Sequence, residues 1–156
     1  STKCDALKLE GGEKIINIIK YLINKNIPVM GHIGLLPQSE RGKFKFKGRS
    51  SFERKRIIED ARLLSNAGVF AIVIECVEES LAEIISKSIS VPTIGIGASR
   101  HCDGQILVTD DLLGLSNFTP RFVKKYSNIK KMINKSVLRF RHDVINKNFP
   151  SRKNIY

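Results

Sequence analysis

The sequence contains no apolar run long enough to cross a lipid bilayer, and no signal peptide is visible at its start. Its three cysteines are an odd number, and none of them forms a Cys-x-x-Cys pair. A disulfide framework and a zinc cluster of cysteines are therefore not expected. Together these absences indicate a protein of the reducing cytoplasm with no membrane partner.

An initiator methionine is also lacking, because the chain begins at Ser1 and enters an apolar, strand-like segment within a few residues. We interpret this start as that of a chain cut upstream, with processing or a cloning boundary as the alternatives. The 156 residues are enough for one domain with one sizeable core, and no repeat or low-complexity segment divides them. We therefore expect residues 1–156 to form a single domain.

Basic residues are abundant and give the chain a formal net charge of +12. Such a charge is found in proteins that bind nucleic acids, and the densest basic cluster lies between Arg41 and Arg56. However, lysine is used heavily along the whole chain, and no RNA-binding or DNA-binding motif accompanies the charge. We therefore expect nucleic acid not to be the main partner.

Short apolar segments rich in β-branched residues alternate with segments of helical periodicity. Strands are predicted at residues 6–10, 29–33, 70–76, 91–97 and 105–109. Helices are predicted at 13–26, 52–67, around 81–85 and in the tail. In the tail, apolar side chains recur every three or four residues, and we expect this stripe to pack in a core: Phe122, Tyr126, Ile129, Ile133, Val137 and Phe140.

The alternation of strands and helices predicts an α/β fold with parallel strands and right-handed crossovers. The segment 70–76 supports this fold, because a strand that is covered on both faces reads as an almost continuous apolar run. Five strands suit either an open, doubly wound sheet or part of a barrel. A complete (β/α)8 barrel needs about 250 residues, so a barrel would be incomplete here.

Two charged residues, Lys8 and Glu10, end the first predicted strand just before Gly11-Gly12. Because alternate side chains of a strand point to the same face, these two share a face. Charges on a buried strand are costly unless they are paired, hydrated or bound to a ligand. The carboxyl ends of parallel strands also carry the active sites of α/β folds. Lys8 and Glu10 form either part of a site or a simple internal ion pair.

Glu75 follows five apolar residues at the end of the third predicted strand. A partly desolvated carboxylate there suits general-base chemistry, although an exposed residue at the strand exit is the alternative. His32 ends the second strand between two glycines, which indicate a close approach of the backbone to another group. A lone histidine is more often structural than chemical. Cys76 has no histidine placed to activate it and is interpreted as a buried structural thiol.

Several segments, taken together and in order, resemble the ketopantoate hydroxymethyltransferase (3-methyl-2-oxobutanoate hydroxymethyltransferase) family. The longest and most specific of them is 31–39, GHIGLLPQS. The others are KLEGG at 8–12, FKFKGR at 44–49, IECV at 74–77, IGIGA at 94–98, CDGQILV at 102–108, PRFVK at 120–124 and FPS at 149–151. The resemblance covers essentially the whole chain.

This resemblance implies a cytoplasmic TIM-type barrel, of which the chain would hold about the last five strand-helix units. It also implies magnesium, 5,10-methylenetetrahydrofolate as co-substrate, a ketoacid substrate and assembly into a homo-oligomer. Matched residue by residue, Glu10 falls on a magnesium ligand and Lys8 on the lysine that binds the ketoacid. Glu75 falls on the catalytic proton acceptor, and His32 on a neighbour of the active site.

The sequence also departs from the family pattern. The first strand-helix units of the family, with two aspartate metal ligands, would lie upstream of Lys8. Asp110-Asp111 stands where His-Asp is usual, Ser99 replaces a glycine, and Glu78 stands where a proline is common. Three hypotheses follow: part of a working hydroxymethyltransferase, a degenerate product that retains the motifs without the activity, or a basic half-barrel that binds nucleic acid.

Overall fold

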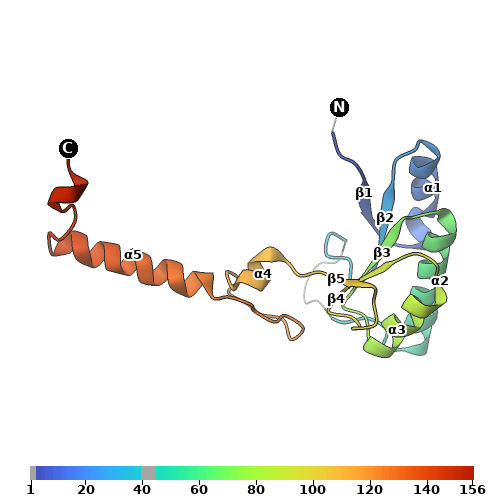
Figure 1. Ribbon diagram of the computed structural model, residues 1–156. Helices are drawn as coiled ribbons and strands as arrows, with labels where there is room; N and C mark the ends of the chain where they lie inside the picture. The colour runs from blue at the N-terminus through green and yellow to red at the C-terminus, as the bar shows by residue number, and fades with distance from the viewer. Residues whose placement is uncertain (1–2, 40–44) are drawn as a thin grey trace. The chain divides into compact units, whose positions relative to one another are not determined.

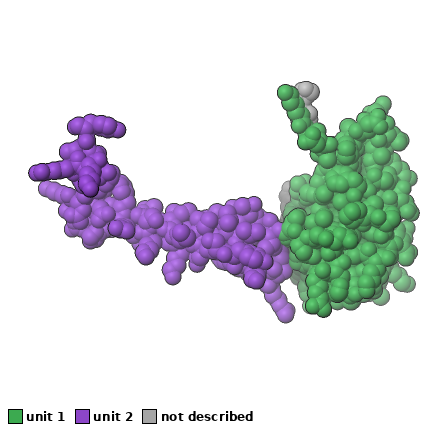
Figure 2. Space-filling view, viewed as in Figure 1, with its two compact units in different colours: residues 1–106 green, residues 107–156 purple. Residues whose placement is uncertain are grey.

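The computed structural model of the protein describes residues 3–39 and 45–156. By its internal contacts the chain divides into two compact units, Ser1–Ile106 and Leu107–Tyr156 (Figure 2). Part of the basic loop and of the 44–49 segment falls on residues 40–44, outside the described residues. In the part of the chain that is described, no helix has both the length and the apolar character needed to cross a membrane.

The first unit is built on a five-stranded parallel sheet whose strands lie in chain order (Figure 1). These strands are β1 (Leu7–Glu10), β2 (Val29–Gly34), β3 (Ala71–Glu75), β4 (Thr93–Ile96) and β5 (Gly104–Gln105). Each pairs in parallel with the next, and the α/β class predicted from the sequence is confirmed.

Helices cover one face of this sheet (Figure 1). They are η1 (Glu13–Ile15), α1 (Ile16–Asn24), α2 (Ser51–Ala67) and α3 (Glu79–Ser88). Their apolar sides meet alternate side chains of β2 and β3, and Ile19, Leu64, Ile72, Ile74 and Leu81 are all fully buried in this core. The opposite face of the same strands therefore carries the other alternate set, which includes Lys8, Glu10, His32 and Glu75.

The length of α2 follows from the residues that begin and end it. The Ser50 hydroxyl accepts a hydrogen bond from the Glu53 backbone N–H at 3.1 Å, which is a standard N-cap contact. At the other end Gly68 adopts φ +92°, the left-handed conformation that closes many helices. Ile57, Ala61 and Leu64 face the core at helical spacing between these caps, as the sequence predicts.

Strands in chain order with helices on one face distinguish between the two folds that the sequence left open. A doubly wound sheet reverses its strand order and has helices on both faces. Over residues 3–39 and 45–106 no such reversal is present. The first unit is thus an α/β fold with a parallel sheet, compatible with part of a TIM-type barrel.

The fifth predicted strand, 105–109, is wrong in extent. β5 has only two residues, and Thr109 begins a short helix, α4 (Thr109–Leu113). The Ile106 N–H still donates to the Gly95 carbonyl at 3.0 Å, but Ile106 and Val108 are about half exposed. The apolar run continues past the point where strand pairing ends, so a prediction based on its composition made the strand too long.

The second unit contains α4, α5 (Ile129–Ile145) and the 3-10 helix η2 (Arg152–Asn154). The predicted tail helix exists, but it begins at Ile129 rather than near Phe122. The expectation that its apolar stripe packs in a core is wrong for the described structure, because α5 has no buried residue. Ile133, Val137 and Phe140 are each at least 50% exposed.

Candidate active site

The four residues singled out in the sequence meet on one face of the sheet. In the register of β1 against β2, Glu10 lies beside His32. In the register of β2 against β3, Gly34 lies beside Glu75, so Glu75 is two residues further along the strands than His32. All of them are at or near the carboxyl ends of their strands. The strand ends thus bring Lys8, Glu10 and Glu75 together around His32.

His32 is the centre of this cluster and is 1% exposed. Its Nδ1 lies 3.2 Å from Lys8 Nζ and 3.7 Å from Glu10 Oε1. Its Nε2 lies 3.2 Å from Glu75 Oε2, although the angle between them is not that of a hydrogen bond. The imidazole thus connects two groups of β1, Lys8 and Glu10, with Glu75 of β3.

The contact with Lys8 assigns the protonation of the imidazole. An ammonium group has only hydrogens to donate, so Nδ1 must be the acceptor in the contact at 3.2 Å. A neutral imidazole that accepts at Nδ1 carries its hydrogen on Nε2. That hydrogen is on the side of the Glu75 carboxylate, whose Oε2 lies 3.2 Å from Nε2.

The two carboxylates differ in their surroundings. The Glu10 side chain is 8% exposed, and its Oε2 accepts a hydrogen bond from the Gln38 N–H at 3.1 Å. The Glu75 side chain is 17% exposed, and its carboxylate makes no hydrogen bond with the described residues. Glu10 is therefore held by a backbone donor, whereas the Glu75 carboxylate is not.

The backbone at Glu75 is tightly constrained. Its carbonyl accepts a hydrogen bond from Leu35 N–H at 2.8 Å. Gly34 has φ +94°, and a Cβ added there would lie 2.2 Å from the same carbonyl oxygen. Only glycine allows this close approach, so the glycine after His32 serves the placement of Glu75.

Cys76 follows Glu75 with a φ of +49°, which is rare for a residue with a side chain. Burial, and then the charge of Glu75, raise the pKa of its thiol to about 11. A thiol with such a pKa stays protonated near neutral pH and is a poor nucleophile. The interpretation of Cys76 as a buried structural thiol is consistent with this environment.

Sequence reasoning missed a network that holds the turn after Glu75. Arg54, on α2, donates to the Glu78 carboxylate at 2.6 Å and to the Ser80 hydroxyl at 3.1 Å. Glu78 also caps α3 by accepting from the N–H groups of Ser80 and Leu81. The Ser80 hydroxyl and then Arg54 lower the pKa of Glu78 to about 2. Arg54 and Glu78 are 24 residues apart, and no local pattern pairs them.

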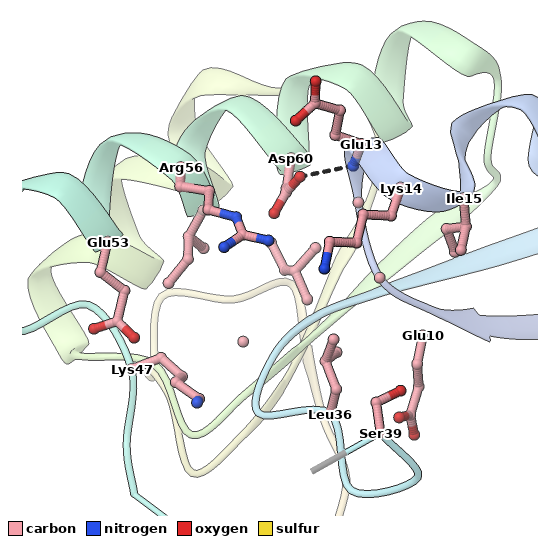
Figure 3. A pocket seen from close by; sticks show the side chains of 15 residues that line it. Glu10, Glu13, Lys14, Ile15, Leu36, Ser39, Lys47, Glu53, Arg56 and Asp60 are labelled. Atoms are coloured by element: carbon pink, nitrogen blue, oxygen red, sulfur yellow. Dashed lines mark hydrogen bonds between the residues drawn. The ribbon is translucent and has the colours of Figure 1, made fainter.

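A cavity of about 340 Å³ borders Glu10 on the side of α2 and η1 (Figure 3). Its charged lining comes mainly from helices, which is why an argument based on strand ends did not find it. Among its lining residues are Glu10, Lys14, Lys47, Glu53, Arg56 and Asp60. Gly12 lines it too, and a Cβ there would lie 1.9 Å from Asp60 Oδ1, so only glycine leaves room for Asp60.

The site can be tested for its fit to a hard cation such as magnesium. Glu10 offers a partly buried carboxylate oxygen, which is the donor type that magnesium prefers. Within residues 3–39 and 45–156, no group of three or more His, Cys, Asp or Glu side chains is arranged to hold a metal ion. This chain therefore fits the role of supplying one ligand, Glu10, to a site completed by other groups.

Comparison with known proteins shows the family of the chain. The family model for ketopantoate hydroxymethyltransferase matches residues 1–152. The chain belongs to this family. A 3-methyl-2-oxobutanoate hydroxymethyltransferase of Pelagibacter ubique (strain HTCC1062) is 63% identical over 155 residues, which cover 99% of this chain and 60% of that protein.

Two further relatives carry the same name as the Pelagibacter protein. The one from Phenylobacterium zucineum (strain HLK1) is 50% identical over 99% of this chain and 57% of its own length. The one from Clostridium botulinum (strain Alaska E43 / Type E3) is 49% identical over 97% of this chain and 56% of its own length. The chain thus spans 56% to 60% of the length of these ketopantoate hydroxymethyltransferases.

Proposed function

We propose that this chain carries the base, one metal ligand and the ketoacid-binding lysine of a ketopantoate hydroxymethyltransferase. The reaction transfers a hydroxymethyl group from 5,10-methylenetetrahydrofolate to 3-methyl-2-oxobutanoate and forms ketopantoate, a step of pantothenate synthesis. The observation that carries the proposal is the cluster of Lys8, Glu10 and Glu75 around the buried His32, in a chain of this family.

Each residue has a separate task in this reaction. Lys8, an exposed residue at the edge of the cluster, binds the carboxylate of the ketoacid. Glu75 removes the proton from C3 of the ketoacid, because its carboxylate is partly desolvated and makes no hydrogen bond with the described residues. The carbanion formed at C3 attacks the methylene carbon of the folate, and the first of that carbon's two bonds to nitrogen breaks. Water then replaces the second nitrogen, so that the product carries a hydroxymethyl group and both nitrogens are left protonated in tetrahydrofolate.

Glu10 is proposed as the magnesium ligand that this chain contributes. A magnesium ion bound there supplies Lewis acidity toward the ketoacid carbonyl, which makes the C3 proton more acidic. The buried His32 ring holds the side chains of Lys8, Glu10 and Glu75 in position through its contacts with them. Its neutral form also avoids a second positive charge next to Lys8.

The proposal extends to the fold and the surroundings. A TIM-type barrel accounts for a sheet whose strands run in chain order and whose functional residues lie on the face opposite the helices. The remaining strands and the two aspartate ligands implied by the resemblance would complete the site. Assembly into a homo-oligomer and a cytoplasmic location belong to the same proposal, and nothing favours a nucleic-acid partner.

The test is ketopantoate formation by the full-length protein that contains this chain. Purified protein is supplied with 3-methyl-2-oxobutanoate, methylenetetrahydrofolate and magnesium, and the product is quantified by mass spectrometry. We expect turnover that is lost after treatment with EDTA and restored by added magnesium. Binding of the ketoacid without turnover would instead support the degenerate product, and failure to bind the ketoacid would overturn the proposal.

A further inference from the structure

The cavity beside Glu10 is closed by three segments that are distant in sequence. Its wall is formed by the turn after β1, the turn after β2 and the first half of α2. The volume of about 340 Å³ lies in the range of small-molecule sites. Its apolar lining consists of Ile15, Ile33, Leu36 and Ile57. Such a cavity suits a small ligand with both an apolar part and charged groups.

The acidic residues of the cavity already have hydrogen-bond donors. Glu53 Oε2 accepts from the N–H groups of Gly48 and Arg49, at 2.7 and 3.1 Å. Asp60 Oδ1 accepts from the Glu13 N–H at 2.8 Å, and Glu10 accepts from Gln38 N–H. The Glu13 carboxylate is directed away from the cavity (Figure 3). These backbone donors offset part of the negative charge around the cavity.

The basic residues Arg56 and Lys14 are in the opposite situation. Neither makes an ion pair or a side-chain hydrogen bond with any residue in 3–39 or 45–156. Figure 3 shows the Arg56 guanidinium and the Lys14 ammonium pointing into the same space. Lys47 lines the cavity as a third cation. A guanidinium and an ammonium that converge without a protein partner match the two carboxylates of a small dianion.

We infer that this cavity binds the p-aminobenzoyl-glutamate part of the folate donor, with the glutamate carboxylates on Arg56 and Lys14. The inference rests on the proposed function, which supplies the folate. The p-aminobenzoyl ring is flat and apolar and meets the isoleucines, and the glutamate brings two carboxylates. The ketoacid is too small to need this space, and its own carboxylate has Lys8.

The position of the cavity agrees with this assignment. Glu10 borders both the cavity and the cluster around His32. A folate whose tail lies in the cavity therefore extends toward Glu10, the proposed metal ligand, and toward the ketoacid bound at Lys8. The one-carbon unit bridges N5 and N10, at the end of the p-aminobenzoyl group that is remote from the glutamate, so binding the tail here directs that unit to the cluster.

The first experiment measures binding of p-aminobenzoyl-glutamate to the full-length protein by isothermal titration calorimetry, which requires no turnover. We expect binding that weakens about tenfold in Arg56→Gln and in Lys14→Gln, because each substitution removes one charge-assisted hydrogen bond. Arg56→Lys should keep most of the affinity. The matched control is Arg62→Gln, which removes an exposed cation from the same helix outside the cavity and should have no effect.

The second experiment is steady-state kinetics with two donors, methylenetetrahydrofolate and its analogue in which both glutamate carboxylates are amides. Arg56→Gln should raise KM about tenfold for the first donor only, with the KM for the ketoacid unchanged. An equal effect on both donors, or equal binding of p-aminobenzoyl-glutamate by Arg56→Gln and the parent protein, would overturn the inference. Binding without any turnover would overturn the proposed function and leave the folate-tail site standing.

Discussion

The Nε2 atom of His32 lies 3.2 Å from Oε2 of Glu75, while the other ring nitrogen faces Lys8 at the same distance. One buried ring thus contacts the proposed base on one side and the proposed ketoacid-binding lysine on the other. The two contacts can be separated by substitution. Asparagine can replace the acceptor at Nδ1, whereas the longer glutamine can replace the donor at Nε2.

His32→Asn should keep the contact with Lys8 and lose the contact with Glu75. We expect kcat to fall about tenfold or more while the KM for the ketoacid stays near that of the parent. His32→Gln should retain more of kcat, because its amide nitrogen can still donate toward Glu75. Steady-state kinetics of both variants check this, and a larger loss in the glutamine variant would contradict the assigned tautomer.

Glu75→Gln should abolish proton removal without disturbing the site, since an amide of the same shape cannot act as the base. We expect kcat to fall by a factor of about 10² to 10⁴ and ketoacid binding to persist. Turnover and calorimetric binding of 3-methyl-2-oxobutanoate measure the two effects.

Glu79→Gln is the matched control for Glu75→Gln, because Glu79 is an exposed glutamate four residues along the chain. It should leave both turnover and ketoacid binding unchanged. Full turnover by Glu75→Gln would remove Glu75 from the role of base.

Much of this site could be predicted because its residues are charged in strands that are otherwise apolar. Lys8, Glu10 and Glu75 are charged residues at the ends of apolar strands, and in parallel sheets such ends converge. The alternation of side chains along a strand was enough to place Lys8 and Glu10 on one face. The sequence could not show that His32 lies between them, because the register between strands depends on tertiary packing.

The parts that sequence reasoning missed depend on contacts between distant residues. Arg54 and Glu78 meet only because α2 packs beside α3, and Arg56 reaches the cavity only because α2 packs against η1, which follows β1. For the apolar stripe of the tail, the sequence led us to expect packing that the structure does not have. Its periodicity correctly indicated a helix, but periodicity does not reveal whether an apolar face is covered, and α5 has no buried residue.

Gly34→Ala tests the constraint on the Glu75 backbone. The substitution adds a Cβ that would lie 2.2 Å from the Glu75 carbonyl oxygen at a φ of +94°. We expect a loss of at least about 3 kcal/mol in the free energy of unfolding, measured by urea denaturation.

Gly68→Ala separates backbone strain from the clash in that experiment. Gly68 has a similar φ of +92°, but the nearest atom to its added Cβ would be 3.9 Å away. Its loss should be only about 1 kcal/mol. Equal losses in the two variants would mean that the close approach to Glu75 contributes nothing.

The thiols should react in an order set by exposure and pKa. Cys76 is buried, and its pKa is raised to about 11 by burial and by the charge of Glu75. At pH 8 it is therefore almost entirely protonated, whereas Cys4 is exposed. Alkylation by iodoacetamide, followed by mass spectrometry of the peptides, should label Cys4 well before Cys76. Rapid labelling of Cys76 in the folded protein would contradict the buried, protonated thiol.

The charge of Glu78 should make stability depend on pH in a narrow acidic range. Its pKa falls from 4.5 to about 2 in the folded protein, first through the Ser80 hydroxyl and then through Arg54. A carboxyl group whose pKa is lowered by folding stabilises the folded state at pH values above its pKa in the unfolded chain. This stabilisation is lost as the pH falls toward its pKa in the folded protein. The contribution should therefore be complete above pH 4.5 and vanish near pH 2.

Glu78→Gln measures that contribution, because it keeps an oxygen that can cap α3 and removes the charge. The Glu78 side chain is 35% exposed, so solvent screening limits the effect to about 1 kcal/mol at pH 7. Urea unfolding of both proteins from pH 2 to 7 should give curves that differ at neutral pH and converge at the acidic end. For Glu79→Gln, the difference from the parent in free energy of unfolding should be the same at every pH from 2 to 7. A difference for Glu78→Gln that persists undiminished at pH 2 would show that packing or cap geometry, rather than the ion pair with Arg54 and the charged cap, accounts for it.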